Sequence, residues 1–307
     1  MKPSIFTLTG NLLWEKTLSF DRWSAGHAQR AAHESFQVGG KGINVAKMLT
    51  RLRTPATALC FPGGATGTEC VAWLRGKKIP FRAFPSSAST RIGVVIRGRR
   101  HETTFLGRDT PPDAAALRAC ARFLAAQPRH SALAICGSFP GWDSPAAAPL
   151  RAALDCWLAR GGFLAADTYG PPLAWLVQRP LGLVKINRTE FDTLFPARQR
   201  RRSVSSRLQQ ACRRWPVAAW IITDGPGPVW LAEKESPAPV RLIPPAVHEI
   251  SATGSGDVLL ACVLQALFYH RATLAGAVTM ALPYAAANAA NPGVAEFALN
   301  KLPKLRS

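Results

Sequence analysis

Short continuous hydrophobic runs alternate with longer segments of helical spacing along most of this chain. The first run, residues 5–9, predicts a short buried strand. Comparable runs occur at residues 56–61, 132–136, 163–166, 181–185 and 218–223. Segments such as 144–158 and 198–214 lie between them and have the spacing of helices. This alternation predicts an α/β fold in which helices cover both faces of a mostly parallel sheet.

A second pattern, in which apolar and polar residues alternate over short stretches, interrupts the βα repeats. It extends to about Phe20 and is followed by a segment of mixed character up to Val38. Three further strand-like runs lie at residues 81–84, 90–96 and 102–106. Antiparallel strands inserted between βα units can form a lid that excludes water from a site. We therefore expect one domain over residues 1–307, with a small β lid contributed by about 11–38 and 80–108.

Length, apolar runs and cysteine spacing exclude several classes of protein. With 307 residues and 48% hydrophobic content, the chain can bury a large core. The apolar run at 258–268 is too short to span a membrane, and Pro283 interrupts the Ala-rich run at 272–290. The first residues fit a strand better than a signal peptide. The seven cysteines include no C-x-x-C pair, which favours reduced thiols over disulfides or zinc ligands. We expect a cytoplasmic protein without a membrane partner.

The chain is strongly basic, with 38 Lys and Arg residues against 18 Asp and Glu residues and a formal net charge of +20. The densest basic cluster consists of Arg198, Arg200, Arg201, Arg202 and Arg207. A nucleic-acid-binding protein would have such a charge, but no nucleic-acid-binding motif accompanies it. We interpret the cluster as a solvated helix face and do not expect a nucleic-acid partner. The positive field would also favour anionic small-molecule substrates.

A glycine-rich turn opens a helix in the last quarter of the chain. Gly254, Ser255 and Gly256 are followed by Asp257 and by an apolar run at helical spacing. Backbone N–H groups in the first turn of a helix lack partners, and the helix dipole adds positive charge there. Such a turn can bind phosphate oxygens, and glycines let the anion come close. Asp257 also has a simpler interpretation, because acidic residues often cap helices or complement the dipole.

A second glycine-rich stretch, Gly39, Gly40, Lys41 and Gly42, opens another helix and is followed by Asn44. By itself this stretch is a weak signal, because it lacks the spacing of a P-loop and no Ser or Thr follows the lysine. The interpretation of both turns therefore depends on their order and on the motifs that lie between them.

Taken in order, the two turns resemble the signatures of the ribokinase-like (PfkB) carbohydrate kinase family. The stretch that begins with Ile43 is closest to the branch that contains 1-phosphofructokinase and tagatose-6-phosphate kinase. The resemblance implies a three-layer, ribokinase-like fold with a small β lid. It also implies that Gly254, Ser255 and Gly256 hold the migrating phosphoryl group, and that Asp257 removes the proton from the attacking hydroxyl.

The residues that the resemblance assigns to the substrate lie in the first half of the chain and are Glu15, Gly39, Gly40, Lys41, Asn44, Arg91 and Ser138. Lys41 and Arg91 would bind the phosphate of a sugar phosphate. Without the family context, Arg91 would be interpreted as a surface arginine on an edge strand. Glu15 stands where the family has an aspartate that grips sugar hydroxyls, so its carboxylate is one methylene further out.

The residues that the resemblance assigns to the nucleotide lie in the second half of the chain and are Lys185, Asn187, Thr223, Gly225 and Asn288. Glu190 would organise Mg²⁺ through water, which suits an ion that keeps most of its waters. The spacing of Asn187 and Glu190 also fits a plain capping box, so both interpretations stay open. Asp224 replaces a leucine of the family motif, and its charge would be unfavourable near ATP unless it points away or meets Mg²⁺.

We therefore expect an ATP-dependent kinase of a sugar phosphate, most similar to 1-phosphofructokinase, which converts fructose 1-phosphate to fructose 1,6-bisphosphate. ATP and Mg²⁺ are the expected cofactors, and a monovalent cation is a further candidate. Within the family, the alternatives are a tagatose-6-phosphate kinase and a kinase of an unphosphorylated sugar or a nucleoside. Outside it, they are a catalytically weak sugar sensor and a basic nucleic-acid-binding protein. A homodimer formed through the lid is a candidate assembly.

Overall fold

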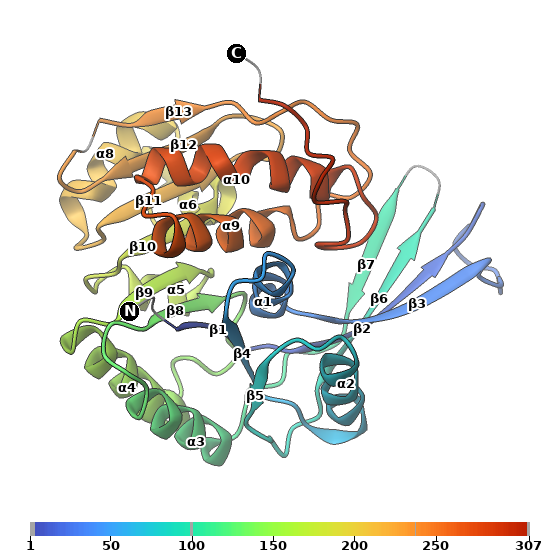
Figure 1. Ribbon diagram of the computed structural model, residues 1–307. Helices are drawn as coiled ribbons and strands as arrows, with labels where there is room; N and C mark the ends of the chain where they lie inside the picture. The colour runs from blue at the N-terminus through green and yellow to red at the C-terminus, as the bar shows by residue number, and fades with distance from the viewer. Residues whose placement is uncertain (1–3, 99–100, 237, 306–307) are drawn as a thin grey trace.

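The first strand, β1 (Ile5–Thr9), is buried along its whole length because it lies inside a nine-stranded sheet. The computed structural model describes residues 4–98, 101–236 and 238–305 (Figure 1). The other strands of this sheet are β4 (Ala56–Cys60), β5 (Phe81–Ala83), β8 (Ala132–Cys136), β9 (Phe163–Asp167), β10 (Leu183–Asn187), β11 (Ala219–Thr223), β12 (Val229–Glu233) and β13 (Val240–Leu242). Their order across the sheet is β13-β12-β11-β10-β9-β8-β1-β4-β5.

Most strands of this sheet pair in parallel, and the two pairings made by β12 are antiparallel. The predicted short apolar runs are therefore the strands of a sheet that is covered on both faces, which is why they do not alternate with polar residues. The α/β fold with a mostly parallel sheet is confirmed. One assignment is corrected: the run at 81–84 was expected in the lid, but β5 pairs with β4 at the edge of the large sheet.

Helices cover both faces of the nine-stranded sheet (Figure 1). The helices on one face are α3 (Ala114–Ala125), α4 (Ala148–Ala159), α5 (Pro171–Leu176), α6 (Arg188–Asp192) and α8 (Val204–Arg214). The helices on the other face are α1 (Lys41–Arg51), α2 (Gly64–Gly76), α9 (Ser255–Tyr269) and α10 (Leu274–Ala289). Two single turns, η1 (Pro145–Ala147) and α7 (Ala197–Arg200), complete the described helices.

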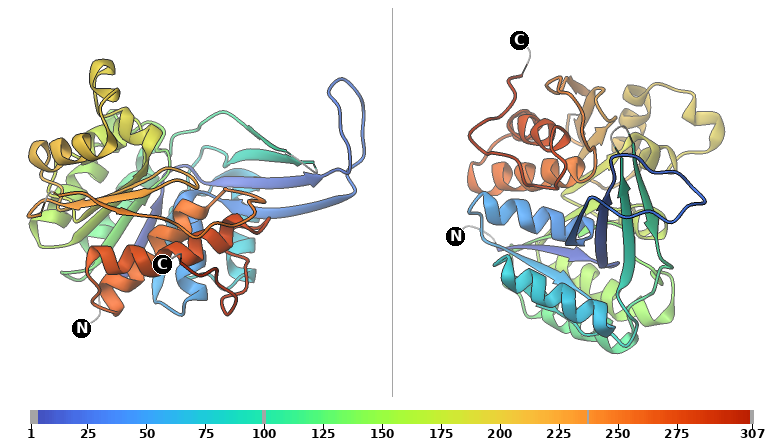
Figure 2. Two further views of the ribbon diagram at one scale, coloured as in Figure 1. Left: turned by 90° about the horizontal axis from the view of Figure 1, so that it is seen from above. Right: turned by 90° about the vertical axis from the view of Figure 1, so that its right-hand side faces the viewer.

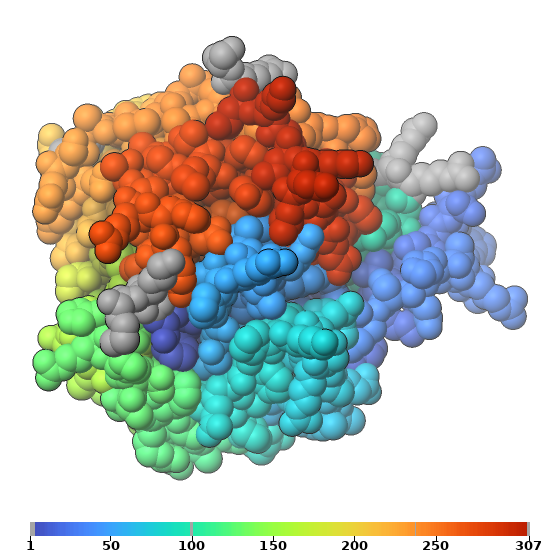
Figure 3. Space-filling model, viewed as in Figure 1, coloured from blue at the N-terminus to red at the C-terminus, as the bar shows by residue number. Residues whose placement is uncertain are grey.

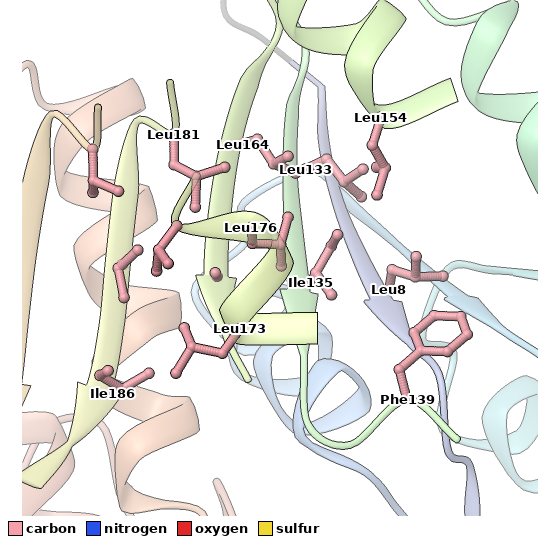
Figure 4. Close-up of a cluster of buried hydrophobic side chains, with 14 of the residues drawn as sticks. Leu8, Leu133, Ile135, Phe139, Leu154, Leu164, Leu173, Leu176, Leu181 and Ile186 are labelled. Atoms are coloured by element: carbon pink, nitrogen blue, oxygen red, sulfur yellow. The ribbon is translucent and has the colours of Figure 1, made fainter. Parts of the chain in front are cut away.

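The larger core cluster lies between the sheet and the first of these helix layers. Leu8, Leu133 and Leu164 come from three neighbouring strands and belong to one buried cluster with Leu154 of α4 and Leu173 of α5 (Figure 4). All five side chains are fully buried. Burial of apolar surface contributes roughly 25 cal/mol per Å², so this layer supplies a large part of the driving force for folding. It also keeps the strand ends that carry the candidate site at fixed positions.

A separate four-stranded sheet projects from the body of the molecule (Figures 1, 2 and 3). Its order is β3-β2-β6-β7, and its strands are β2 (Leu13–Ser19), β3 (His33–Gly39), β6 (Arg91–Arg97) and β7 (Glu102–Leu106). The pairing of β2 with β6 is parallel, and the other two pairings are antiparallel. Alternate residues of β2 are buried, as expected for a strand with one face toward the protein.

The arginine-rich segment predicted as one helix over 198–214 is divided into α7 and α8. Ser203 ends the interruption, because its side chain accepts a hydrogen bond from the backbone N–H of Ser206 and caps α8. One arginine of the basic cluster is not solvated: Arg207 is fully buried, and its guanidinium forms an ion pair with Asp192. That residue therefore contributes to the core instead of to a basic surface.

None of the helices in the described part of the chain combines the length and the hydropathy that a membrane crossing requires.

Candidate active site

A cavity of about 820 Å³ opens at the carboxyl ends of the parallel strands. Thr9 at the end of β1, Cys136 at the end of β8 and Asn187 at the end of β10 line it. Ligands of open α/β sheets bind at this edge. Residues of the four-stranded sheet also line the cavity, among them Leu13 of β2. The sequence-predicted site residues that line it are Glu15, Gly39, Gly40, Lys41, Asn44, Arg91, Ser138, Lys185, Asn187, Glu190, Thr223, Gly225, Gly254, Ser255, Gly256 and Asp257.

The glycine-rich turn at the start of α9 brings backbone and ammonium groups close together. Gly254 has a left-handed backbone with φ 76°, and a Cβ atom there would lie 2.3 Å from the side chain of Val294. A Cβ atom on Gly256 would lie 2.6 Å from Nζ of Lys185. The lack of a side chain therefore lets the lysine approach the first turn of α9, where unpaired N–H groups already carry partial positive charge. This combination supplies the positive charge that an anion site at a helix N-terminus requires.

Asp257 lies in the first turn of α9 and is only 5% exposed. Its Oδ2 atom accepts a hydrogen bond of 2.7 Å from the side-chain amide of Asn44 in the first turn of α1. The two glycine-rich turns are therefore joined through this contact. Burial raises the pKa of Asp257 to about 7, and the charge of Asp167 adds to the increase, while Lys41 and Lys185 oppose it. A carboxylate with a pKa near neutrality can accept a proton from a hydroxyl.

Asp167, at the end of β9, is fully buried and lies between two ammonium groups. Nζ of Lys185 lies 2.6 Å from its Oδ2 atom, and Nζ of Lys41 lies 2.9 Å from its Oδ1 atom. Burial would raise the pKa of Asp167, but the charges of Lys185 and Lys41 outweigh it and hold the pKa below the usual value. Sequence reasoning assigned Asp167 no role, although an acidic residue directly after a buried strand was a usable signal.

Lys41 lines the cavity as the sequence predicted, but in this structure its ammonium contacts carboxylates and not Arg91. The expectation placed Lys41 beside the phosphate of a sugar together with Arg91, but its ammonium lies between Asp167 and Glu190, at 2.9 and 3.0 Å. Burial would lower the pKa of Lys41, but Asp167, Glu190 and Asp257 raise it above the usual value. Lys41 is therefore a bound counter-ion of the carboxylates at the strand ends. The two cations expected on one phosphate belong to different groups of side chains.

Glu190 forms the capping box that the sequence left open, and its other carboxylate oxygen faces the cavity. The side chain of Asn187 accepts from the backbone N–H of Glu190 at 2.8 Å, and Oε2 of Glu190 accepts from the N–H of Asn187 at 2.9 Å, which makes a complete capping box. Its Oε1 atom faces the cavity and bonds to Lys41. The described residues contain no group of three or more His, Cys, Asp or Glu side chains that could hold a metal. Two nearby carboxylates fit Mg²⁺, which keeps waters and is usually held by one or two carboxylates together with substrate phosphates.

On the other side of the cavity, Glu15 of β2 lies directly opposite Gln37 of β3 in the four-stranded sheet. The carboxylate of Glu15 accepts a hydrogen bond from the Gln37 amide through Oε1. Burial raises the pKa of Glu15, and the Gln37 bond opposes the increase. The position of Glu15 is thus set by Gln37, which the sequence analysis did not single out because a strand glutamine carries no local signal.

Arg91 forms an ion pair of 2.7 Å with Asp109, in the segment that follows β7. The side-chain amide of Asn11 donates to Asp109 at 2.8 Å and to the hydroxyl of Ser138 at 2.9 Å. Among the described residues, Nε of Arg91 has no hydrogen-bond partner although it is buried. Arg91 and Ser138 therefore belong to one network. The sequence did not single out Asp109, which is the counter-ion of Arg91 in this network.

In the part of the cavity that the sequence assigned to the nucleotide, the side chain of Asp224 points toward Arg188. Oδ2 of Asp224 lies 2.9 Å from Nη1 of Arg188, and both residues line the cavity beside Thr223 and Gly225. The strands that carry the pair are neighbours, since Asn187 and Thr223 are in register in β10 and β11. The added carboxylate therefore forms an ion pair with the first residue of α6, which directly follows the adjacent strand.

Asn288 is the exception among the predicted site residues, because it is 1% exposed and does not line the cavity. Its amide donates to the carbonyl of Thr253 and to the hydroxyl of Ser255, and its carbonyl accepts from the N–H of Ala295. Its side chain is thus fully used in holding the glycine-rich turn against the segment after α10. The expected contact with adenine is not supported.

Comparison with known sequences assigns the chain to a family. A sequence model described as pfkB family carbohydrate kinase matches residues 11–301. A protein of Borreliella burgdorferi named 1-phosphofructokinase is 27% identical over 300 residues, which cover 95% of this chain and 94% of that protein.

A protein of Mycobacterium tuberculosis named ATP-dependent 6-phosphofructokinase isozyme 2 is 37% identical over a shorter segment of 99 residues. This segment covers 32% of the chain and spans 29% of the length of that relative. Among solved structures, phosphofructokinase-2 of Escherichia coli with substrates and products superposes with a TM-score of 0.84 over 95% of this chain and 94% of that one. At 21% identity this likeness concerns the fold.

Proposed function

The chain belongs to the pfkB family of carbohydrate kinases, and on that premise we propose that it transfers the terminal phosphoryl group of ATP to a hydroxyl of a sugar phosphate. The proposed reaction is that of 1-phosphofructokinase, from fructose 1-phosphate to fructose 1,6-bisphosphate. The relative of that name in Borreliella burgdorferi, which aligns over 95% of this chain, supports the choice of substrate.

The observation that carries the proposal is the position of Asp257. Its carboxylate lies next to the anion site of the turn formed by Gly254, Ser255 and Gly256, and it bonds to Asn44 of the turn expected to contact the sugar. Asp257 thereby stands between a group that would hold a phosphoryl and a group that would hold a hydroxyl. With a pKa of about 7, its carboxylate is available at neutral pH to accept the hydroxyl proton.

Transfer of a phosphoryl group requires mainly positioning and stabilisation of charge. The N–H groups of the α9 turn and the ammonium of Lys185, which approaches Gly256, would stabilise negative charge on the transferred group. Magnesium, when bound with ATP, would neutralise phosphate charge, and Asp167 and Glu190 would hold it directly or through water. Thr223, Gly225 and Asn187 would contact the nucleotide phosphates at the neighbouring strand ends.

At the other end of the cavity, Glu15 would accept hydrogen bonds from sugar hydroxyls, and Arg91 would bind the sugar's phosphate. Nε of Arg91 finds no hydrogen-bond partner in the described part of the chain, which supports an anionic ligand at this place. A substrate phosphate would have to share or displace Asp109, whose side chain is 53% exposed and can turn into solvent. The strands of the four-stranded sheet would act as a lid that keeps water away from the phosphoryl group.

A kinase of an unphosphorylated sugar is a second candidate, and one observation favours it. Asp109 already neutralises Arg91 in this structure, so a neutral sugar would leave the pair intact. A tagatose phosphate is a third candidate substrate. It is supported by relatives named D-tagatose-1-phosphate kinase, such as that of Klebsiella oxytoca, which is 28% identical over 136 residues.

A monovalent cation and self-association complete the proposal. Phosphofructokinase-2 of Escherichia coli has been solved with potassium and in a tetrameric form, which supports testing both for this chain. The four-stranded sheet exposes Ile92, Phe105 and Leu106, with 46%, 57% and 54% of their surfaces accessible, so a homodimer would form through this sheet.

The test is a coupled ADP-release assay over fructose 1-phosphate, fructose 6-phosphate, tagatose phosphates and the free sugars. Fructose 1-phosphate should have the highest kcat/KM. The Asp257→Asn variant should lose at least about a hundredfold in kcat, because a general base typically contributes that much, while it still binds ATP. Equal turnover in the two proteins would remove Asp257 from the mechanism, and a free sugar as the best substrate would favour the second candidate.

A further inference from the structure

Every carboxylate oxygen of Asp167 and Glu190 already has a partner. In Asp167, Oδ1 accepts from Lys41 at 2.9 Å and Oδ2 from Lys185 at 2.6 Å. In Glu190, Oε1 accepts from Lys41 at 3.0 Å and Oε2 accepts from the backbone N–H of Asn187 at 2.9 Å. The two carboxylates proposed to organise a metal therefore have no oxygen that lacks a partner. Lys41 is the group that the two carboxylates share.

Without Lys41, this part of the site would be short of positive charge. Asp167 is fully buried, and Lys185 provides one charge against its carboxylate and that of Glu190. A buried carboxylate that loses its counter-ion is strongly unfavourable. In the absence of a metal, the ammonium of Lys41 thus meets the same electrostatic need that a divalent cation would meet, and it does so at the same two side chains.

The two lysines differ in how tightly they are held. The side chain of Lys185 is 4% exposed and its ammonium is packed against Gly256. The side chain of Lys41 is 28% exposed, and its ammonium lies 5.8 Å from the ring of Tyr169, which is itself partly in solvent. Lys41 is the one of the two that can change partners.

We propose that Lys41 is an internal counter-ion that holds Asp167 and Glu190 in place before ligands bind, and leaves them when a magnesium-bound nucleotide enters. This inference rests on the proposed function. Lys41 then pairs with the phosphate chain of the nucleotide, so that positive charge is exchanged between protein and ligand and the site is never left with unpaired carboxylates. One consequence is that a divalent ion without nucleotide competes with Lys41 for the two carboxylates and binds weakly.

The test measures the binding of Mn²⁺ alone to the nucleotide-free protein by electron paramagnetic resonance of the free ion. Lys41→Met keeps the length of the side chain and removes its charge. It should bind Mn²⁺ at least about tenfold more tightly than the wild type, because apparent affinity scales with the fraction of molecules whose site is open. Lys41→Arg should behave like the wild type. Lys77→Met is a matched control, because Lys77 packs on Trp73 and does not line the cavity.

A double variant, Lys41→Met with Glu190→Gln, tests whether the gained affinity belongs to these carboxylates. It should lose the tighter binding of Lys41→Met. Equal Mn²⁺ affinity in folded wild type and Lys41→Met would overturn the proposal, as would tight binding that survives in the double variant. If Lys41→Met does not fold, the single variant Glu190→Gln remains informative. Without nucleotide it should bind Mn²⁺ as weakly as the wild type does, because Lys41 already blocks the site in the wild type. A clear loss of Mn²⁺ affinity in Glu190→Gln would contradict the proposal. These measurements need no turnover, so they can fail or succeed independently of the proposed reaction.

Discussion

Two ion pairs face the same cavity but differ in their surroundings. Lys185 and Asp167 have side chains that are 4% and 0% exposed, whereas Arg91 and Asp109 have side chains that are 12% and 53% exposed. The first pair is carried by neighbouring strands of the large sheet, and the second joins the four-stranded sheet to the segment after it. The difference separates a fixed part of the site from an adjustable one.

The fixed part lies where the chemistry would take place. Buried charges cannot leave their partners without a large penalty, so the pair between Lys185 and Asp167 stays formed as ligands come and go. The adjustable part lies where the sugar would be recognised, because an exposed carboxylate exchanges easily with water or with an anionic ligand. We therefore expect substitutions in the second pair to change the KM for the sugar substrate and to leave kcat nearly unchanged.

The largest effect is expected from Asp167→Asn, which removes the carboxylate partner of the buried Lys185 ammonium and one of the two partners of Lys41. The free energy of unfolding should fall by about 3–5 kcal/mol, the range observed when one partner of a buried ion pair is removed. The matched change Asp109→Asn should alter it by less than about 1 kcal/mol, as for exposed pairs. Urea unfolding of both variants measures the contrast. Similar losses in the two proteins would contradict the division into fixed and adjustable parts.

A smaller effect should appear in the pH dependence of kcat/KM. The base must be deprotonated to act, and the pKa of Asp257 is raised to about 7. The value of kcat/KM for the sugar substrate should therefore rise with pH up to about 7 and fall about tenfold per pH unit below it. A profile of kcat/KM from pH 5 to 9 measures this limb, because kcat/KM reports the groups of the enzyme without bound substrate. A profile that is flat down to pH 5 would mean that Asp257 does not provide the titrating base.

The smallest effects should come from the exposed pair. Arg91→Ala should raise the KM for fructose 1-phosphate about tenfold and leave kcat nearly unchanged, because a charged hydrogen bond to the substrate is lost. Asp109→Asn should lower this KM by up to about fivefold, since the competing carboxylate is removed. Steady-state kinetics of both variants distinguish the candidates: if neither KM changes, the substrate carries no phosphate at Arg91.

The fold could be predicted in most of its parts from the chain itself. The apolar runs that become β8 and β11 match the observed strands within a residue. The failures were local. Phe81–Ala83 was assigned to the lid because a short run does not reveal its partner strand, and the helix over 198–214 was taken as continuous although Ser203 interrupts it.

The sequence by itself determined where the βα repeats, the two glycine-rich turns and Asp257 lie, because those features depend on spacing along a few residues. The tertiary structure alone decided which charges meet. Lys41 and Asp167 are 126 residues apart, and Asn11 and Asp109 are 98 apart, so no local pattern could pair them. Strand order brings these side chains to one edge of the sheet. Because an unpaired buried charge is strongly unfavourable, each charge then pairs with the opposite charge that lies nearest to it.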